Sequence, residues 1–203
     1  MAKGSDAQMI VKPSVDGLAA SALSAANAGA RKGPPPVHLW NPPYCGDLDI
    51  RIARDGTWFY LGTPIGRAPL VRLFASILRA EGGRYFLVTP VEKVGITVED
   101  APLFAVDFTL DNAGPDQTIT FHTRTEDDAV CGPDHPLRVT RSKGTDEPAP
   151  YVLIRPGLEA RIDRKSFYRL VDLGTVEPLD GTDWFGVRSS GHFFPMIPAQ
   201  ELP

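Results

Sequence analysis

Hydrophobic and polar residues alternate along several short stretches of the chain. Leu48, Ile50 and Ile52 are separated by charged residues, and this spacing of two is typical of a strand with one buried face. Asp55-Gly56 follows as a strong hairpin-turn signal, and the aromatic-rich segment 58–61 is predicted to be the return strand. Similar patterns predict further strands over residues 84–89, 94–98, 103–110, 118–123, 137–139, 151–155, 158–162, 184–188 and 192–196.

Three other segments show the three-to-four-residue spacing of a helix. Residues 15–27 carry a narrow apolar stripe, and residues 70–78 carry a wider one that we expect to end at Gly82-Gly83. The third helix is predicted over residues 164–173, where Asp163 is a favourable N-cap. Because strands and helices are mixed and the strands are joined by short turns, the pattern indicates an α+β fold with antiparallel sheets.

The order of elements occurs twice. Residues 67–73 and 164–170 align without a gap: both have arginine at the first and sixth positions, an apolar residue at the fourth and leucine at the seventh. Each segment is preceded by two strands and followed by two more. The interpretation is a repeated β-β-α-β-β motif, although chance agreement over seven positions is an alternative.

This repeat predicts two similar subdomains, each an antiparallel sheet with a packed helix, and a cleft between them. The N-terminal subdomain is expected over residues 1–99 and the C-terminal one over residues 100–203. Within the first, residues 1–12 are predicted to be disordered. Residues 31–43 are a Pro-rich connector, which is extended because proline disfavours a helix.

Composition removes some classes of protein and favours others. Hydrophobic residues make up 42% of the chain, charged residues 23%, and the net charge is −4. Basic residues are spread along the chain, so no footprint for duplex nucleic acid is indicated. No apolar run approaches the roughly 20 residues of a membrane helix. We interpret Leu18–Ala30 as an Ala-rich helix rather than a secretion signal, and two cysteines without a CxxC pair fit a cytoplasmic protein.

Motifs of high specificity for catalysis are absent from the sequence. It contains no GxSxG, no Walker-type loop, no GxGxxG and no HExxH. We therefore expect no cofactor and no metal, and the balance favours a protein that is not an enzyme. Cys45 has no cationic neighbour along the chain to activate its thiol, so we interpret it as structural.

Arginines at the starts of the two matching helices are the main candidates for a ligand site. Arg67 and Arg164 lie where free N–H groups and the helix dipole attract anions. A phosphate or carboxylate would satisfy both the arginine and the N–H groups, whereas a structural ion pair is the alternative for each arginine. The other predicted ligand contacts are Lys93, Arg124, Arg161 and Tyr168, the last by stacking on a ring.

A second candidate site would use histidines and acids. His122 is followed by Asp127, Asp128 and His135, and a His–Asp pair could support acid–base chemistry. The spacing fits no compact metal motif, and a polar contact between neighbouring strands is the alternative.

Several runs of residues resemble one known family, the proteobacterial domain-of-unknown-function family numbered 1285. The resemblance covers about residues 40–195, and it implies a two-domain fold with repeated motifs, an interdomain cleft suited to a nucleotide-like ligand, and a role in signalling. It implies no catalytic residue. The runs are CGDLDIRIARDGTWFYLGTPIGR at 45–67, FLVTPVEK at 86–93, FHTRTEDDAV at 121–130, HPLRV at 135–139 and ARIDRKSFYRL at 160–170.

Residues and resemblance together predict a non-enzymatic binding module. Its partner would be a small anionic, nucleotide-like ligand in the cleft, held by the six candidates above. A protein-interaction adaptor and an enzyme built on the His/Asp group are the alternative functions.

Overall fold

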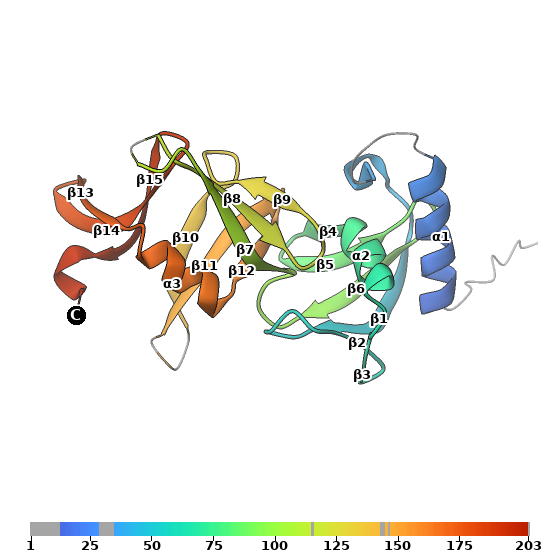
Figure 1. Cartoon of the computed structure of the whole chain (residues 1–203). Coiled ribbons are helices and arrows are strands. Elements are labelled where there is room, and N and C mark those ends of the chain that lie inside the picture. Colours follow the sequence, from blue (N-terminus) through green and yellow to red (C-terminus); the bar gives the residue numbers. More distant parts are fainter. Residues whose placement is uncertain (1–12, 29–34, 115, 143–144, 146, 203) are drawn as a thin grey trace, which may run out of the picture. The chain divides into compact units, whose positions relative to one another are not determined.

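The computed structural model describes residues 13–28, 35–114, 116–142, 145 and 147–202. The segment 1–12, the predicted helix end at Gly29 and the start of the connector lie outside this part of the chain. The chain folds into two domains that each combine a sheet with a helix, which confirms the predicted α+β class (Figure 1). No helix among the described residues is both long enough and apolar enough to span a bilayer.

Two compact units can be distinguished by their internal contacts. The first unit contains the described residues up to Ile50 together with Tyr60–Thr97, and the second contains Arg51–Phe59 and the residues from Val98 onward. The limits predicted from sequence, 1–99 and 100–203, stay predictions, as does the cleft between the halves.

The first sheet has six strands in the order β3-β2-β1-β6-β5-β4. The helices associated with it are α1 (Val15–Ala28) and α2 (Ala68–Ser76), and a short 3-10 turn, η1, covers Val37–Leu39. Its strands are β1 (Tyr44–Ile52), β2 (Trp58–Tyr60), β3 (Thr63–Pro64), β4 (Leu78–Glu81), β5 (Arg84–Val88) and β6 (Lys93–Val98).

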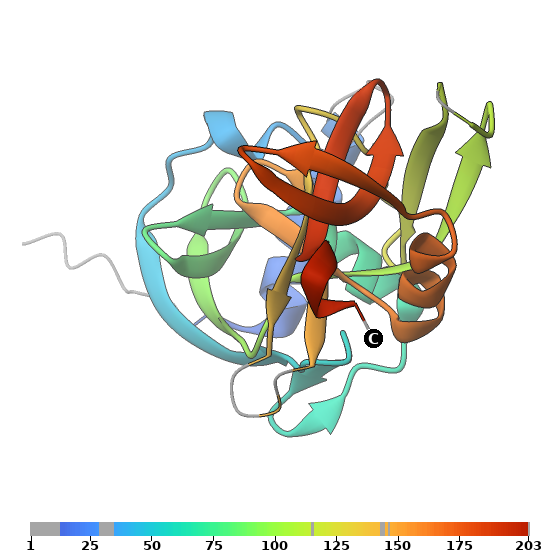
Figure 2. The same ribbon diagram turned by 90° about the vertical axis from the view of Figure 1, so that its left-hand side faces the viewer.

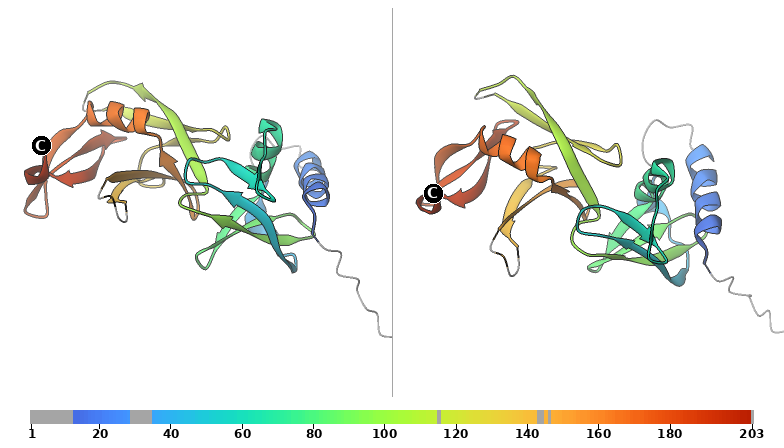
Figure 3. Two further views of the ribbon diagram at one scale, coloured as in Figure 1. Left: turned by 90° about the horizontal axis from the view of Figure 1, so that it is seen from below. Right: turned by 60° about the horizontal axis from the view of Figure 1, so that its bottom comes forward.

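Helices α1 and α2 lie side by side, as Figures 1 and 3 show. Leu18 and Ala22 of α1 are fully buried, as is Phe74 of α2. Leu18 and Ala22 are four residues apart, so α1 turns a single apolar stripe inward. The predicted helix over residues 15–27 is thereby confirmed.

The second sheet has the order β10-β11-β12-β7-β8-β9. Its strands are β7 (Leu103–Asp111), β8 (Thr118–Thr123), β9 (Asp128–Val130), β10 (Leu137–Arg141), β11 (Pro148–Arg155) and β12 (Leu158–Ile162). Strands β7 and β12 are parallel, with Ala160 opposite Leu103. The expectation of purely antiparallel sheets is therefore wrong at this pair, because strands far apart in the chain need no hairpin and can pair in either direction.

A third sheet comes after helix α3 (Arg164–Val171) and contains β13 (Thr175–Leu179), β14 (Thr182–Ser189) and β15 (His192–Pro198). Figure 2 shows it in red as a separate sheet with α3 beside it. The chain of β14 passes so close to β15 at Gly186 that an added Cβ would lie 2.2 Å from the carbonyl oxygen of Phe194. A second 3-10 turn, η2 (Ala199–Glu201), comes after β15.

Several elements differ from the prediction. Helix α2 ends at Ser76 instead of Leu78, and Leu78 begins strand β4. Gly82-Gly83 accordingly forms the β4–β5 turn rather than a helix end, because Leu78 and Glu81 pair with Leu87 and Arg84 of β5. Strands β3, β9 and β13 were not predicted, since all three are short edge strands without a clear apolar alternation. Each of α2 and α3 is followed by three strands instead of the predicted two.

Candidate functional site

A cavity of about 480 Å³ lies in the second unit beside the start of α3. Its walls combine charged side chains with aromatic rings, which offer a small molecule polar as well as stacking contacts. The charged lining residues are Arg54, Asp55, Glu147, Arg161, Asp163 and Arg164. The aromatic ones are Phe104, Phe167 and Tyr168.

Helix α3 begins directly after Asp163, which is its N-cap and also lines this cavity. The Asp163 backbone is extended (φ −67°, ψ 160°), and its carboxylate accepts a hydrogen bond of 2.7 Å from the backbone N–H of Ser166. An N-cap of this kind satisfies one of the free N–H groups of the first turn. The predicted cap is confirmed, and it leaves Arg164 as the first residue of the helix.

Arg164 and Tyr168 form a pair one helical turn apart. The guanidinium donates to the Tyr168 hydroxyl from Nε at 3.1 Å and from Nη2 at 2.9 Å, and it lies 5.5 Å from the ring centroid. The hydrogen bond to Tyr168 raises the pKa of Arg164, which is charged at physiological pH in any case. Tyr168 is 54% exposed, so one ring of the cavity is open to a stacking partner.

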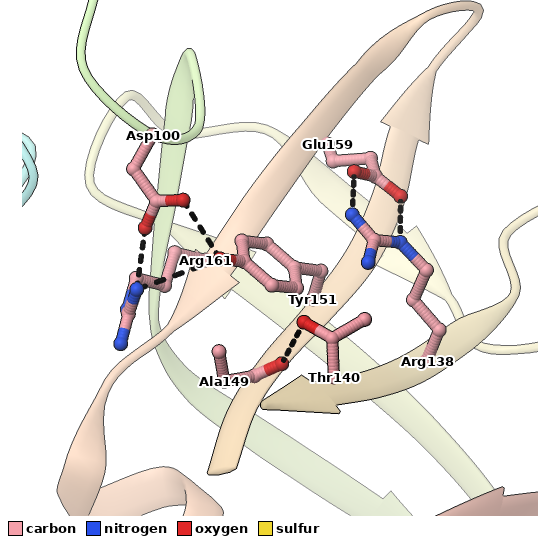
Figure 4. A network of polar contacts seen from close by, with 7 residues as sticks. All are labelled: Asp100, Arg138, Thr140, Ala149, Tyr151, Glu159 and Arg161. Carbon is pink, nitrogen blue, oxygen red and sulfur yellow. Dashed lines mark hydrogen bonds and ion pairs between the residues drawn. The ribbon is translucent and has the colours of Figure 1, made fainter. Parts of the chain in front are cut away.

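Arg161 lies in the cavity wall with its charge already balanced. Its guanidinium forms an ion pair with Asp100 and also contacts the Tyr151 hydroxyl at 3.5 Å, as Figure 4 shows. The Tyr151 hydroxyl donates to Asp100 at 2.7 Å, and burial is the main cause that raises the pKa of Tyr151. Because Asp100 compensates Arg161, this arginine attracts an added anion less strongly than an unpaired one would.

A second ion pair extends the same network on the neighbouring strands. Arg138 of β10 donates two hydrogen bonds to Glu159 of β12, and its guanidinium lies 4.4 Å from the Tyr151 ring centroid (Figure 4). Tyr151 thus contacts two arginines and one carboxylate. These linked contacts hold the Arg161 side chain in place.

Arg124 does not line the cavity but supports two residues that do. Its guanidinium donates to the carbonyl oxygen of Asp55 at 3.1 Å and stacks on the Phe104 ring at 4.9 Å. Gly56 lies against the same ring, since an added Cβ would be 2.8 Å from the Phe104 Cβ. Hydrogen bonds from Thr57, with a further contribution from Arg124, lower the pKa of Asp55.

The remaining two predicted ligand contacts belong to the first unit. Lys93 forms an ion pair of 2.9 Å with Glu81 and lies 5.1 Å from the Phe86 ring centroid. Arg67 is exposed and is the N-cap residue of α2. Of the six predicted residues, three therefore line one cavity, Arg124 contacts its wall, and two lie in the other unit.

The predicted histidine–acid group does not converge on one point. His122 bonds to Asp128 through Nδ1 at 2.7 Å and to Thr109 through Nε2 at 3.2 Å. Asp127 instead pairs with Arg155 at 3.4 Å, and His135 bonds to the carbonyl oxygen of Leu153. Among the described residues, no group of three or more His, Cys, Asp or Glu side chains is placed to hold a metal.

Both cysteines have free thiols, and they differ in their surroundings. Cys131 is buried, and burial raises the pKa of its thiol to about 12, so the reactive thiolate is suppressed. Cys45 is half-buried on β1.

Sequence reasoning did not identify several cavity residues. Asp55 was interpreted only as part of a hairpin turn, and Phe104 only as one residue of a strand. Glu147 was not among the predicted contacts. No local signal marks these residues, because they come together from three distant parts of the chain. Phe167 could have been found, since it lies next to Tyr168 in the matching helix segment.

Comparison with known proteins supports the sequence resemblance. The N-terminal domain model of the DUF1285 family matches residues 35–101, and the C-terminal domain model matches residues 102–196. A DUF1285 family crystal structure from Silicibacter pomeroyi is 59% identical, with a TM-score of 0.79 over 89% of this chain and 96% of that chain.

A second DUF1285 crystal structure, from Shewanella baltica, is 33% identical, with a TM-score of 0.47 over 61% of this chain and 90% of that chain. No curated protein matches the sequence. Since the two domain models together span most of the chain, and the Silicibacter pomeroyi protein matches nearly all of it, this protein belongs to the DUF1285 family.

Proposed function

We propose that this protein is a binding module for a small anionic, nucleotide-like ligand and that the cavity beside α3 holds it. The observation that carries the proposal is the Arg164–Tyr168 pair, which offers a cation and an exposed ring in one cavity wall. The family resemblance adds a role in signal transduction, in which occupancy of this cavity would be the signal.

Charge in the cavity favours an anion at Arg164 in particular. The hydrogen-bond partner of Arg164 is a neutral phenol, whereas Arg161 is paired with the carboxylate of Asp100. Glu147 is the acidic residue whose charge acts on Arg164. A phosphate or carboxylate that displaces Glu147 from this neighbourhood would gain charge-assisted hydrogen bonds from the guanidinium.

Ring stacking accounts for the nucleotide-like part of the ligand. Tyr168 offers an exposed face, and Phe104 lines the same cavity with Arg124 against its ring. Stacking a base on an aromatic side chain contributes roughly 1–3 kcal/mol in nucleic-acid complexes. An anion at Arg164 and a ring at Tyr168 would thus be recognised by neighbouring side chains of one helix.

Calorimetric titration with adenosine monophosphate, cyclic dinucleotides and inorganic phosphate tests the proposal. Loss of a charged hydrogen bond costs about 1.5–3 kcal/mol, so Arg164→Ala should weaken binding roughly tenfold to hundredfold. Arg84→Ala is the matched control, because Arg84 is also exposed and stacked on aromatic rings but lies in the first unit.

Three further results interpret the titration. Tyr168→Ala should weaken the nucleotides more than it weakens inorganic phosphate. Arg67→Ala tests whether Arg67, which belongs to the first unit, also contributes to binding, as the sequence predicts. Equal affinities for wild type, Arg164→Ala and Arg84→Ala, or binding of none of the probes, would remove the proposal.

A further inference from the structure

A second cavity, of about 350 Å³, lies on the other flank of α3. Its lining is mainly apolar: Phe167 and Val171 come from α3, Phe185 from β14, and Met196 and Ile197 from β15. The two charged residues in its wall, Arg141 and Glu201, form an ion pair with each other. This cavity therefore offers apolar contact without a net charge.

The two cavities share part of their walls. Phe167 and Pro148 line both of them. Residues four apart on a helix lie on the same face, so the polar pair Arg164–Tyr168 borders the first cavity while the apolar pair Phe167–Val171 borders the second. One helix thus separates a charged, ring-lined space from an adjoining apolar one.

We infer that a single amphipathic ligand occupies both cavities. Its anionic head would lie at Arg164, and an aliphatic chain would pass over Phe167 and Pro148 into the second cavity. The chain would bury apolar surface against Val171, Met196 and Ile197, which is favourable because that surface leaves water. This inference rests on the proposed function and assigns the ligand class: a phosphorylated or carboxylated head that carries an apolar chain.

The compensated charge of the second cavity selects this occupant over a second anion. An added anion would have to compete with Glu201 for Arg141, whereas an uncharged chain leaves the ion pair intact. The shared lining at Phe167 and Pro148 places such a chain within reach of the head. The length of the chain should therefore control affinity.

Calorimetric titration of the full chain with inorganic phosphate, butyl phosphate and octyl phosphate, below the micelle concentration, tests the inference. Four additional methylene groups should tighten binding by up to roughly two-hundredfold if all four enter an apolar cavity. Val171→Asn should remove most of this gain and leave phosphate affinity unchanged. Val130→Asn is the matched control, since Val130 is an exposed valine that lines neither cavity.

The outcomes separate the inference from the proposed function. If phosphate and butyl phosphate bind but octyl phosphate binds no tighter, the shared ligand is overturned and the anion site stands. If none of these phosphates binds, the inference is overturned, and the proposed function falls with it only when adenosine monophosphate and the cyclic dinucleotides also fail to bind. Octyl phosphate that binds equally well to Arg164→Ala would show two independent sites, which also overturns the inference.

Two other occupants of the apolar cavity would be detected directly. Sedimentation that shows a dimer dissociated by Val171→Asn would assign the cavity to a second copy of the chain. Binding to vesicles of equal parts phosphatidylglycerol and phosphatidylcholine, without binding of monomeric octyl phosphate, would assign it to a membrane surface. Either result replaces the small amphipathic ligand.

Discussion

Helices α2 and α3 begin with matching sequences and yet present different surfaces. Arg67 is the N-cap residue of α2 and makes no side-chain cap hydrogen bond, whereas Asp163 caps α3 and leaves Arg164 as the first helical residue. Four residues after Arg67 the chain has Val71, while four residues after Arg164 it has Tyr168. The one-residue difference in cap position and the single phenol explain why only α3 shows an arginine–tyrosine pair.

The two regions also differ in the strands that come after the helix. After α2 the chain returns to the first sheet as β4, β5 and β6, but after α3 it forms the separate sheet β13–β15. A repeated order of elements therefore does not imply a repeated arrangement. In the second region the extra sheet supplies Phe185 and Met196, and these two residues line the apolar cavity beside α3.

The largest expected effect is at the glycine that permits the third sheet. In Gly186→Ala the new Cβ would lie 2.2 Å from a backbone oxygen, which cannot move without shifting β15. We expect a loss of about 3 kcal/mol in the free energy of unfolding, measured by urea titration. At Gly95 of the first region the nearest atom, 1.9 Å from an added Cβ, is a carboxylate oxygen of Asp47, which can rotate away.

Gly95→Ala should accordingly cost less than Gly186→Ala, and Gly132→Ala, with its nearest contact at 3.7 Å, should cost least. Equal losses for all three would contradict the close approach of β14 to β15.

The next effect concerns the buried thiol of the second region. Burial raises the pKa of Cys131 from 9.0 to about 12, so above pH 9 the unfolded chain releases this proton before the folded one does. The stability that the buried, protonated thiol contributes is fully present below pH 9, and it is lost as the pH rises toward about 12. At pH 10.5 the loss amounts to about 2 kcal/mol.

Urea titrations at pH 8 and pH 10.5 measure this loss. Between these two pH values, the free energy of unfolding of Cys131→Ala should fall by about 2 kcal/mol less than that of the wild type. Cys45→Ala is the control in the first region. The same fall in all three proteins would refute a buried, protonated Cys131.

Exchanging the caps tests the helix comparison itself. Asp163→Ala removes the bond to the Ser166 N–H and should destabilise the protein by about 1 kcal/mol. Arg67→Asp introduces a capping carboxylate at α2 and should stabilise it by a smaller amount. Thermal unfolding measures both changes, with Asp163→Asn as the variant expected to stay close to wild type.

The smallest effect is at a turn that occurs in both regions. Leu61-Gly62 and Asp180-Gly181 each place two successive residues at positive φ, with Leu61 at +48° and Asp180 at +49°. Leucine is disfavoured there, and Leu61 is 64% exposed, so little burial is lost on substitution. Leu61→Asn should raise the free energy of unfolding by about 0.5–1 kcal/mol, whereas Asp180→Leu should lower it; urea titration measures both.

Much of the secondary structure could be predicted from the chain alone. The β8 limits, the N-cap at Asp163 and the turn at Asp55-Gly56 result from period, cap preference and turn chemistry, which act over a few residues. The end of α2 could not be predicted, because Ile77 and Leu78 are apolar and suit a buried strand as well as a helix.

Local sequence determined that α3 would begin after Asp163 and that Arg164 and Tyr168 would share one face, because helix geometry alone relates residues four apart. Tertiary structure decided what they face. Asp55, Phe104 and Glu147 reach the cavity from three segments, and the parallel β7–β12 pair brings together two strands that are far apart in the second domain. Such contacts depend on how whole strands pair and pack, and no short-range pattern records that choice.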